Sequence, residues 1–99
     1  MRIISRNTIK VFWENPDNRD AEGPLRAWFA EASQAAWKTP AEVKSKYGNG
    51  SIIHGNRFVF NIAGNKYRLA VKIHYNTGVI YIRFIGTHAQ YDQINVETI

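Results

Sequence analysis

The stretch Lys66–Asp92, KYRLAVKIHYNTGVIYIRFIGTHAQYD, decides the fold that we expect. Apolar and polar residues alternate along Lys66–Tyr75 and again along Val79–Ile85, with the period of two that is typical of strands. Asn76–Gly78 supplies turn residues between them, which predicts an antiparallel hairpin. The THAQ sequence at 87–90 then has the spacing of a capping box, so a helical turn should follow the last strand directly.

The residues before this stretch add helices and one more hairpin strand. Pro16 should end a first helix capped by Ser5 or Asn7, and Pro24 suits the start of a second helix. Thr39 begins another capping box. The elements expected there are a possible strand at residues 2–4, helices at about 5–15, 24–37 and 40–47, and a strand at 57–62. We therefore predict one α+β domain, residues 1–99, with helices on one face of an antiparallel sheet and a short C-terminal helical turn.

The composition indicates a negatively charged partner. Thirteen Lys and Arg residues against eight Asp and Glu give a net charge of +5 and a pI near 9.8, which suits a polyanion, an acidic protein or an anionic membrane surface. No apolar run approaches the roughly 20 residues of a membrane span, and the start lacks the apolar centre of a signal peptide. We therefore expect a cytoplasmic protein. The absence of cysteine excludes a disulfide framework and a thiol nucleophile.

Strand alternation separates the core side chains from those that could carry chemistry. The core set is Tyr67, Leu69, Val71, Ile73 and Tyr75 on one strand, and Ile80, Ile82 and Phe84 on the next. The opposite set, which includes Ile85, should lie on an uncovered face. Its cations and aromatic rings are Lys66, Arg68, Lys72, His74, Tyr81 and Arg83. The tryptophans Trp13, Trp28 and Trp37 fall on helical apolar stripes, so they should be core residues.

A face of this kind suits RNA, because guanidinium groups bind phosphate in bidentate geometry and aromatic rings stack on unpaired bases. The alternative is that the same row of Lys and Arg is only a solvated face. Arg83 lies between apolar neighbours on a strand that should be central, where a charge without a partner is costly. Its position therefore favours either a specific anion or an internal carboxylate.

RNA can be cleaved by its own 2'-hydroxyl, provided that one group accepts a proton, another donates one, and cations stabilise the phosphate. His88 and Tyr91 could supply both proton roles, since residues three apart share one face of a helical turn. Arg68 and Arg83 could hold the phosphate. The alternatives are that His88 is an ordinary surface histidine and that Tyr91 is a core ring. No histidine has the spacing of a metal site, so we expect neither a metal nor a cofactor.

Two segments carry a resemblance to a known family. FVFNIAGNKYRLAVKI, Phe58–Ile73, and VIYIRFIGTHAQYDQI, Val79–Ile94, closely resemble the HigB-type toxins, which are mRNA interferases of the RelE-like group. The similarity is most specific in FNIAGNKYRL and IRFIGTHAQYD. The first half of the chain is similar in length and in helix placement, so the resemblance extends over essentially the whole sequence.

The resemblance implies a RelE-like fold with two leading helices, cleavage of mRNA on the translating ribosome, and neutralisation by a cognate helix-turn-helix antitoxin of the HigA type. It assigns Arg68 and Arg83 to the scissile phosphate, and His88 and Tyr91 to proton transfer. Two other functional classes stay open. One is a non-catalytic RNA- or ribosome-binding module that uses the same sheet, and the other is a protein-interaction domain whose basic face meets an acidic partner.

Overall fold

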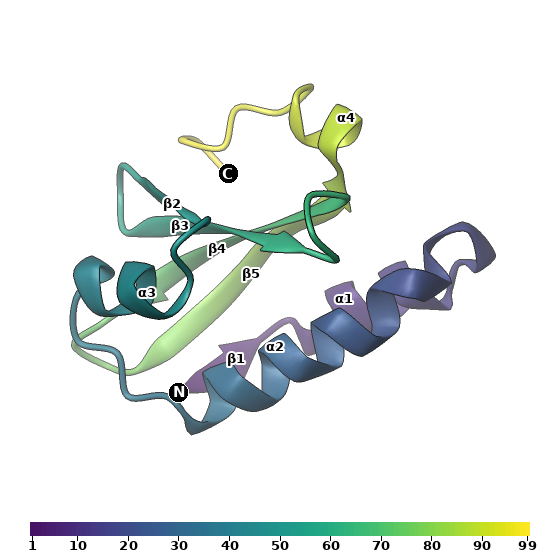
Figure 1. Ribbon diagram of the computed structural model, residues 1–99. Coiled ribbons are helices and arrows are strands. Elements are labelled where there is room, and N and C mark those ends of the chain that lie inside the picture. The colour runs from purple at the N-terminus through teal and green to yellow at the C-terminus, as the bar shows by residue number, and fades with distance from the viewer.

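The computed structural model describes residues 1–99, and it has the expected α+β architecture, with one sheet between two layers (Figure 1). The elements in chain order are β1 (Arg2–Ile4), α1 (Arg6–Glu14), the 3-10 segment η1 (Pro16–Ala21), α2 (Glu22–Gln34), α3 (Pro40–Lys46), β2 (Ser51–Ile53), β3 (Arg57–Ile62), β4 (Tyr67–His74), β5 (Val79–Thr87) and α4 (His88–Tyr91). None of the helices combines the length and the apolar character that crossing a membrane requires.

The sheet has the strand order β1-β5-β4-β3-β2. The two hairpins expected from the sequence, β3 with β4 and β4 with β5, are confirmed. Two short strands extend the sheet, because β2 pairs with β3 and β1 pairs with β5. The β1–β5 pair is parallel, so the sheet is mixed and not wholly antiparallel as expected. The reason is topological: the helices separate β1 from the meander, and such a crossover allows parallel pairing.

Helix α2 differs from the expected helix at both ends. It begins at Glu22, two residues before Pro24, because η1 leads directly into it. It ends at Gln34, where the backbone becomes extended, so Trp37 lies beyond the helix although it is buried as expected. The amino group of Met1 donates hydrogen bonds to carbonyl oxygens of the last turn, including the Ser33 oxygen at 2.8 Å. These bonds satisfy carbonyls that have no partner within the helix.

Both capping boxes predicted from the sequence place helix starts correctly. The Thr39 hydroxyl accepts a hydrogen bond from the Glu42 amide at 3.3 Å, which begins α3. The Thr87 hydroxyl accepts one from the Gln90 amide at 3.1 Å, and the Gln90 side chain accepts one from the Thr87 amide at 2.8 Å. Strand β5 therefore continues into α4 without a loop, as expected.

The core lies between the helices and one face of the sheet, which we call the inner face. One cluster joins buried residues of α1, α2 and α3 to alternate residues of β3, β4 and β5. Phe60 is at its centre, because its ring packs against those of Trp28, Trp37, Tyr47 and Phe58. All three tryptophans are buried, which confirms their assignment to the core.

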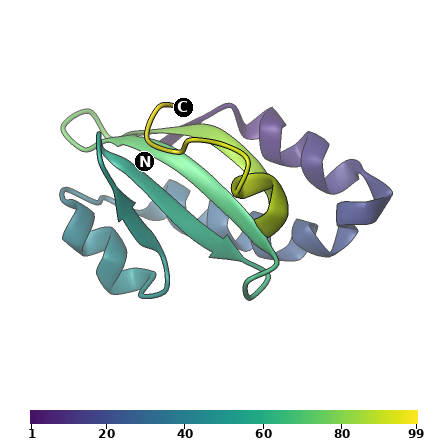
Figure 2. The same cartoon turned by 90° about the horizontal axis from the view of Figure 1, so that it is seen from above.

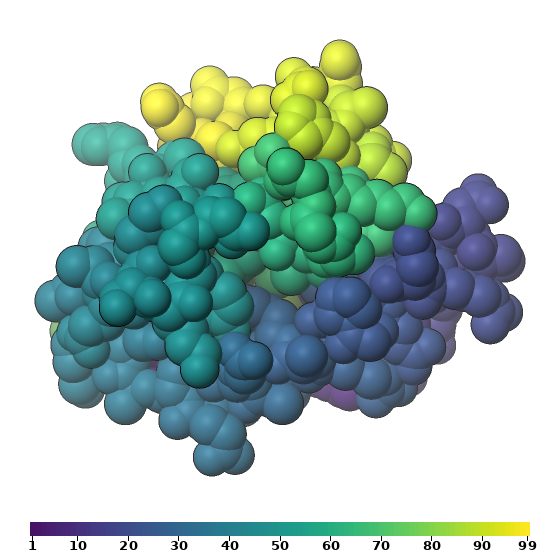
Figure 3. All heavy atoms as spheres, in the orientation of Figure 1, coloured from purple at the N-terminus to yellow at the C-terminus, as the bar shows by residue number.

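The opposite face of the sheet, the outer face, is partly covered. Helix α4 and the segment 92–99 lie on it, on the far side of the sheet from α1 and α2 (Figure 1). Seen from above, the C-terminal segment runs across the strands (Figure 2), and in the space-filling view it forms its own layer at the top of the molecule (Figure 3). The expectation of a fully uncovered face is wrong, because the chain after α4 turns back over the sheet.

Candidate functional site

Three rows of residues cross the outer face at paired positions of β3, β4 and β5. In the order from the α4 end, they are Asn61, Arg68 and Gly86, then Val59, Ala70 and Phe84, then Arg57, Lys72 and Tyr81. Val59 and Ala70 are each only 1% exposed, so an apolar row separates the two polar ones. Arg68 and Lys72 are four positions apart along β4, which places these polar rows about 13 Å apart.

A β-bulge determines where Arg83 points. Strand β5 carries this one extra residue between two successive pairs with β4. Such a residue has no cross-strand partner, and it reverses the alternation of the residues after it. Phe84 consequently lies on the outer face and Ile85 packs against the core. This is the reverse of the expectation from a regular strand, whereas Arg83 stays exposed on the outer face as expected.

The third row belongs to a cavity of about 250 Å³, which we call the basic groove. Its lining residues are Arg57, Lys72, His74, Tyr81, Arg83, Thr98 and Ile99. The rings of His74 and Tyr81 meet in edge-to-face geometry, with centroids 5.0 Å apart. The groove thus gathers four residues that the sequence analysis assigned to RNA or phosphate binding, and it adds Arg57, which that analysis missed. Its strand position opposite Lys72 was the available signal.

Arg68 lies in the first row, beside α4. Its guanidinium carbon is 5.6 Å from the centroid of the Tyr91 ring, within the range of a cation–π contact. The Tyr91 ring in turn packs against Phe84, with centroids 6.3 Å apart. The Nε atom of Arg68 is buried and has no hydrogen-bond partner. A buried donor without an acceptor costs about 1–3 kcal/mol, so an anionic oxygen beside this atom would be stabilising.

His88 begins α4 and is exposed beside the same row. Its Nδ1 atom lies 3.3 Å from the Oδ2 atom of Asp92, one helical turn later. A carboxylate in this position orients the imidazole ring, as it does for a general base in many enzymes, and Nε2 has no partner within the protein. The sequence analysis gave Asp92 no role, although its i, i+4 spacing from His88 was a signal.

Lys66 differs from the other cations of the expected face. Its ammonium forms an ion pair with Asp20 of η1, and the Tyr67 hydroxyl donates a hydrogen bond to the same carboxylate. The Lys66 contact, followed by the Tyr67 contact, lowers the pKa of Asp20, and the bond to Asp20 raises the pKa of Lys66. A carboxylate thus compensates the charge of Lys66. The Lys66 carbonyl accepts a hydrogen bond from the His88 amide at 3.3 Å, which ties α4 to the start of β4.

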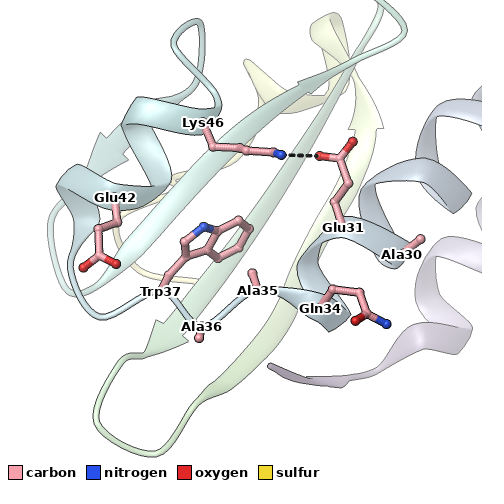
Figure 4. Close-up of a pocket in the computed structure, with 8 residues that line it drawn as sticks. All are labelled: Ala30, Glu31, Gln34, Ala35, Ala36, Trp37, Glu42 and Lys46. Carbon is pink, nitrogen blue, oxygen red and sulfur yellow. Dashed lines mark ion pairs between the residues drawn. The ribbon is translucent and has the colours of Figure 1, made fainter.

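The largest cavity, about 620 Å³, lies elsewhere, between the end of α2 and α3 (Figure 4). Its lining residues are Ala30, Glu31, Gln34, Ala35, Ala36, Trp37, Glu42 and Lys46. Lys46 and Glu31 pair across it at 3.9 Å. Because it brings together none of the expected site residues, we place the candidate site on the outer face.

The structure therefore divides the expected residues between two clusters and leaves one outside. Arg68, His88 and Tyr91 lie at the α4 end, whereas Lys72, His74, Tyr81 and Arg83 lie in or beside the basic groove, and Lys66 is paired with Asp20. Arg68 and Arg83 are not cross-strand neighbours, and two to three residues, or about 7–10 Å of strand, separate them.

Comparison with known proteins identifies the family. None of the curated proteins matches the chain. A family profile described as HigB_toxin, RelE-like toxic component of a toxin-antitoxin system, matches residues 21–94. The match spans α2 through α4, and so it includes both clusters of the outer face apart from the C-terminal residues. Membership of a toxin-antitoxin family implies an antitoxin partner. The chain belongs to the HigB toxin family of RelE-like toxins.

Proposed function

We propose that this toxin is an endoribonuclease that cleaves mRNA on its outer face. One observation carries the proposal: four cations share that face, and none of them forms an ion pair with an Asp or Glu side chain. They are Arg57, Arg68, Lys72 and Arg83, whereas the ion pairs of the structure involve Arg26, Lys46, Lys66 and His88. Uncompensated cations beside aromatic rings are the arrangement that binds the phosphates and bases of single-stranded RNA.

The reaction we propose is transesterification by the RNA's own 2'-hydroxyl, without a metal ion. The 2'-oxygen forms a bond to phosphorus and gives up its proton, while the bond from phosphorus to the 5'-oxygen breaks and that oxygen takes up a proton. His88, oriented by Asp92, and Tyr91 carry these two transfers. Arg68 and Arg83 stabilise the charge on the phosphate. The products are a 2',3'-cyclic phosphate and a 5'-hydroxyl end.

The proposed setting is the translating ribosome in the cytoplasm, with growth inhibition as the outcome. The family supports an antitoxin, and we infer that it is a helix-turn-helix protein of the HigA type. Arg68 supports the chemistry at the α4 end, because its guanidinium lies over the Tyr91 ring and forms no ion pair with an Asp or Glu side chain.

Expression of the chain without an antitoxin tests the proposal. Growth should stop, and cellular mRNA should acquire 2',3'-cyclic phosphate ends within translated regions. Arg83→Ala and His88→Ala should each lower cleavage by about 10²-fold or more, because a phosphate-stabilising or proton-transferring group is lost. Both side chains are exposed, so circular dichroism should show an unchanged fold.

Arg19→Ala is the matched control, because it removes the same charge from η1, where Arg19 lines a separate hollow with residues of α1 and α2, and it should stay toxic. Growth arrest with intact mRNA would contradict cleavage. Binding of RNA without a cyclic phosphate product would instead identify a non-catalytic RNA-binding module. If both variants cleave at the rate of the natural sequence, the residue assignment is wrong.

A further inference from the structure

The Arg57 and Lys72 end of the basic groove lies too far from Arg68 for these residues to contact the same phosphate. The two polar rows are about 13 Å apart along β4, with the apolar row of Val59, Ala70 and Phe84 between them. One phosphate group is much smaller than this separation. An RNA strand that reaches both rows must therefore place different phosphates at the two ends.

Arg57 is the residue that defines this second end. Its Nε atom donates a hydrogen bond to the backbone oxygen of Ile99 at 2.9 Å, and an Nη1 hydrogen is donated to the His54 oxygen at 3.2 Å. These acceptors fix the guanidinium on the wall of the groove, and no side-chain carboxylate pairs with it. Because Ile99 lines the groove, the Nε–H group donates toward the groove side, where a phosphate oxygen could replace the Ile99 oxygen.

A second cation and two rings complete this end of the groove. Lys72 is the cross-strand partner of Arg57, whereas Arg83 lines the groove from the bulge, between the middle row and this one, and stays assigned to the cleaved phosphate. His74 is exposed and Tyr81 half-buried, so their edge-to-face pair presents ring surface to the solvent. A cationic wall next to an aromatic pair can hold a phosphate and stack its neighbouring base.

We infer that the basic groove is a second nucleotide-binding site, which takes a phosphate of the RNA other than the cleaved one, with Arg57 as its principal contact. This inference rests on the proposed function, because it places the groove beside an RNA cleaved at the α4 end. Arg57 anchors the substrate and takes no part in the reaction. Thr98 and Ile99 line the groove in the free protein, and bound RNA displaces the Ile99 oxygen from Arg57.

The test is a phosphate scan with a 2'-O-methyl tetranucleotide, which cannot be cleaved. One linkage at a time is replaced by a neutral methylphosphonate, and binding is measured by fluorescence anisotropy. Arg57→Gln should weaken binding of the unmodified strand about tenfold and reduce the salt dependence by about one phosphate contact. In this variant one methylphosphonate should cost no further affinity. In Lys72→Gln, a methylphosphonate at the same linkage should cost no further affinity. In Arg68→Gln, this should hold at a different linkage.

Arg19→Gln is the control, and it should change binding less than twofold. The inference is overturned if Arg57→Gln binds as the natural sequence does, if it loses sensitivity equally at every linkage, or if its linkage coincides with that of Arg68→Gln. The Lys72→Gln variant keeps the test valid should Arg57→Gln fail to fold. Binding does not require cleavage, so an inactive protein with this linkage pattern would contradict the proposed function alone.

Discussion

The two faces of the sheet carry similar cationic and aromatic residues, but they differ in whether an Asp or Glu side chain contacts the cations. On the helix side, a lysine and the tyrosine next to it in sequence contact one carboxylate, and this arrangement occurs twice. Lys66 and Tyr67 contact Asp20, and Lys46 and Tyr47 contact Glu31. On the outer face, Arg57, Arg68, Lys72 and Arg83 have no such partner. The one side-chain carboxylate there that forms an ion pair is Asp92, which contacts a histidine.

This difference shows that cations alone do not mark a functional face. A Lys or Arg next to a carboxylate belongs to the protein's own electrostatics, as Lys66 does. Cations kept apart from carboxylates repel one another, and burial of Arg68 Nε without a partner adds a further cost. The outer face therefore gives up stability in the free protein in a way that an anionic ligand would offset.

Phe60→Ala should produce the largest effect, and it tests the structural role of the inner face. Phe60 is 1% exposed and contacts four aromatic rings. Its truncation should lower the free energy of unfolding by about 3–5 kcal/mol in chemical denaturation. Arg83→Ala, on the outer face, should change it by no more than about 0.5 kcal/mol. Equal losses in the two variants would remove the contrast between the faces.

Gly86→Ala should have an intermediate effect on the α4 end. An added Cβ would lie 2.6 Å from Phe84 Cζ and 2.7 Å from Gln90 Oε1, so the ring and the capping box must both move. We expect a loss of about 1–2 kcal/mol of stability and a larger relative loss of RNA cleavage, because α4 carries the proton-transfer residues.

Gly23→Ala is the matched control for this substitution. It lies in α2 with no atom within 4 Å of the added Cβ, and it should keep activity and slightly raise stability. The melting temperature and the cleavage rate of both variants give the comparison. Full activity in Gly86→Ala would argue against a role for α4 in catalysis.

Asp20→Asn should have the smallest effect, on the pH dependence of stability. The pKa of Asp20 is lowered in the folded protein from its ordinary value of 3.8, chiefly by the bond from Lys66. The ionised carboxylate therefore stabilises the fold above this ordinary value, and that contribution is lost as the pH falls through the lower, folded-state pKa. The natural sequence should exceed the variant in stability at neutral pH and converge with it in acid.

Asp17→Asn, in the same η1 segment, removes a carboxylate that makes no ion pair, and it should not show this convergence. Urea denaturation between neutral and acidic pH measures both variants. A stability difference for Asp20→Asn that is independent of pH would mean that the Lys66 contact does not stabilise the fold. Lys66 would then belong with the unpaired cations of the outer face.

Much of the fold was predictable because its signals are local. The turn residues between β4 and β5 act within a few positions of the chain, and so do the capping boxes at Thr39 and Thr87. Strand alternation also placed Arg68, Lys72 and Tyr81 on the outer face correctly. It failed at Phe84 and Ile85, because one extra residue in a bulge reverses the pattern and leaves no mark in composition.

The sequence predicted that the candidate site lies on the outer face of the sheet. It did not predict that the site residues form two separate clusters. Arg57 and Ile99 are 42 positions apart in the chain, and Lys66 and Asp20 are 46 apart. No periodicity relates residues at such separations. As a result, the sequence analysis treated Lys66 as equivalent to the other cations, and it could not place Ile99 beside Arg57.

The amino-acid sequence by itself determined the β-meander, the helix starts and the basic character of one sheet face, since these depend on hydrogen bonds and side-chain directions within a few residues. Tertiary structure decided which cations stay unpaired. The return of the C-terminal segment over the sheet, the bulge at Arg83 and the contact of η1 with Lys66 are set by packing between distant segments. The charge on each cation is present in the sequence, but the nearest carboxylate is a property of the fold.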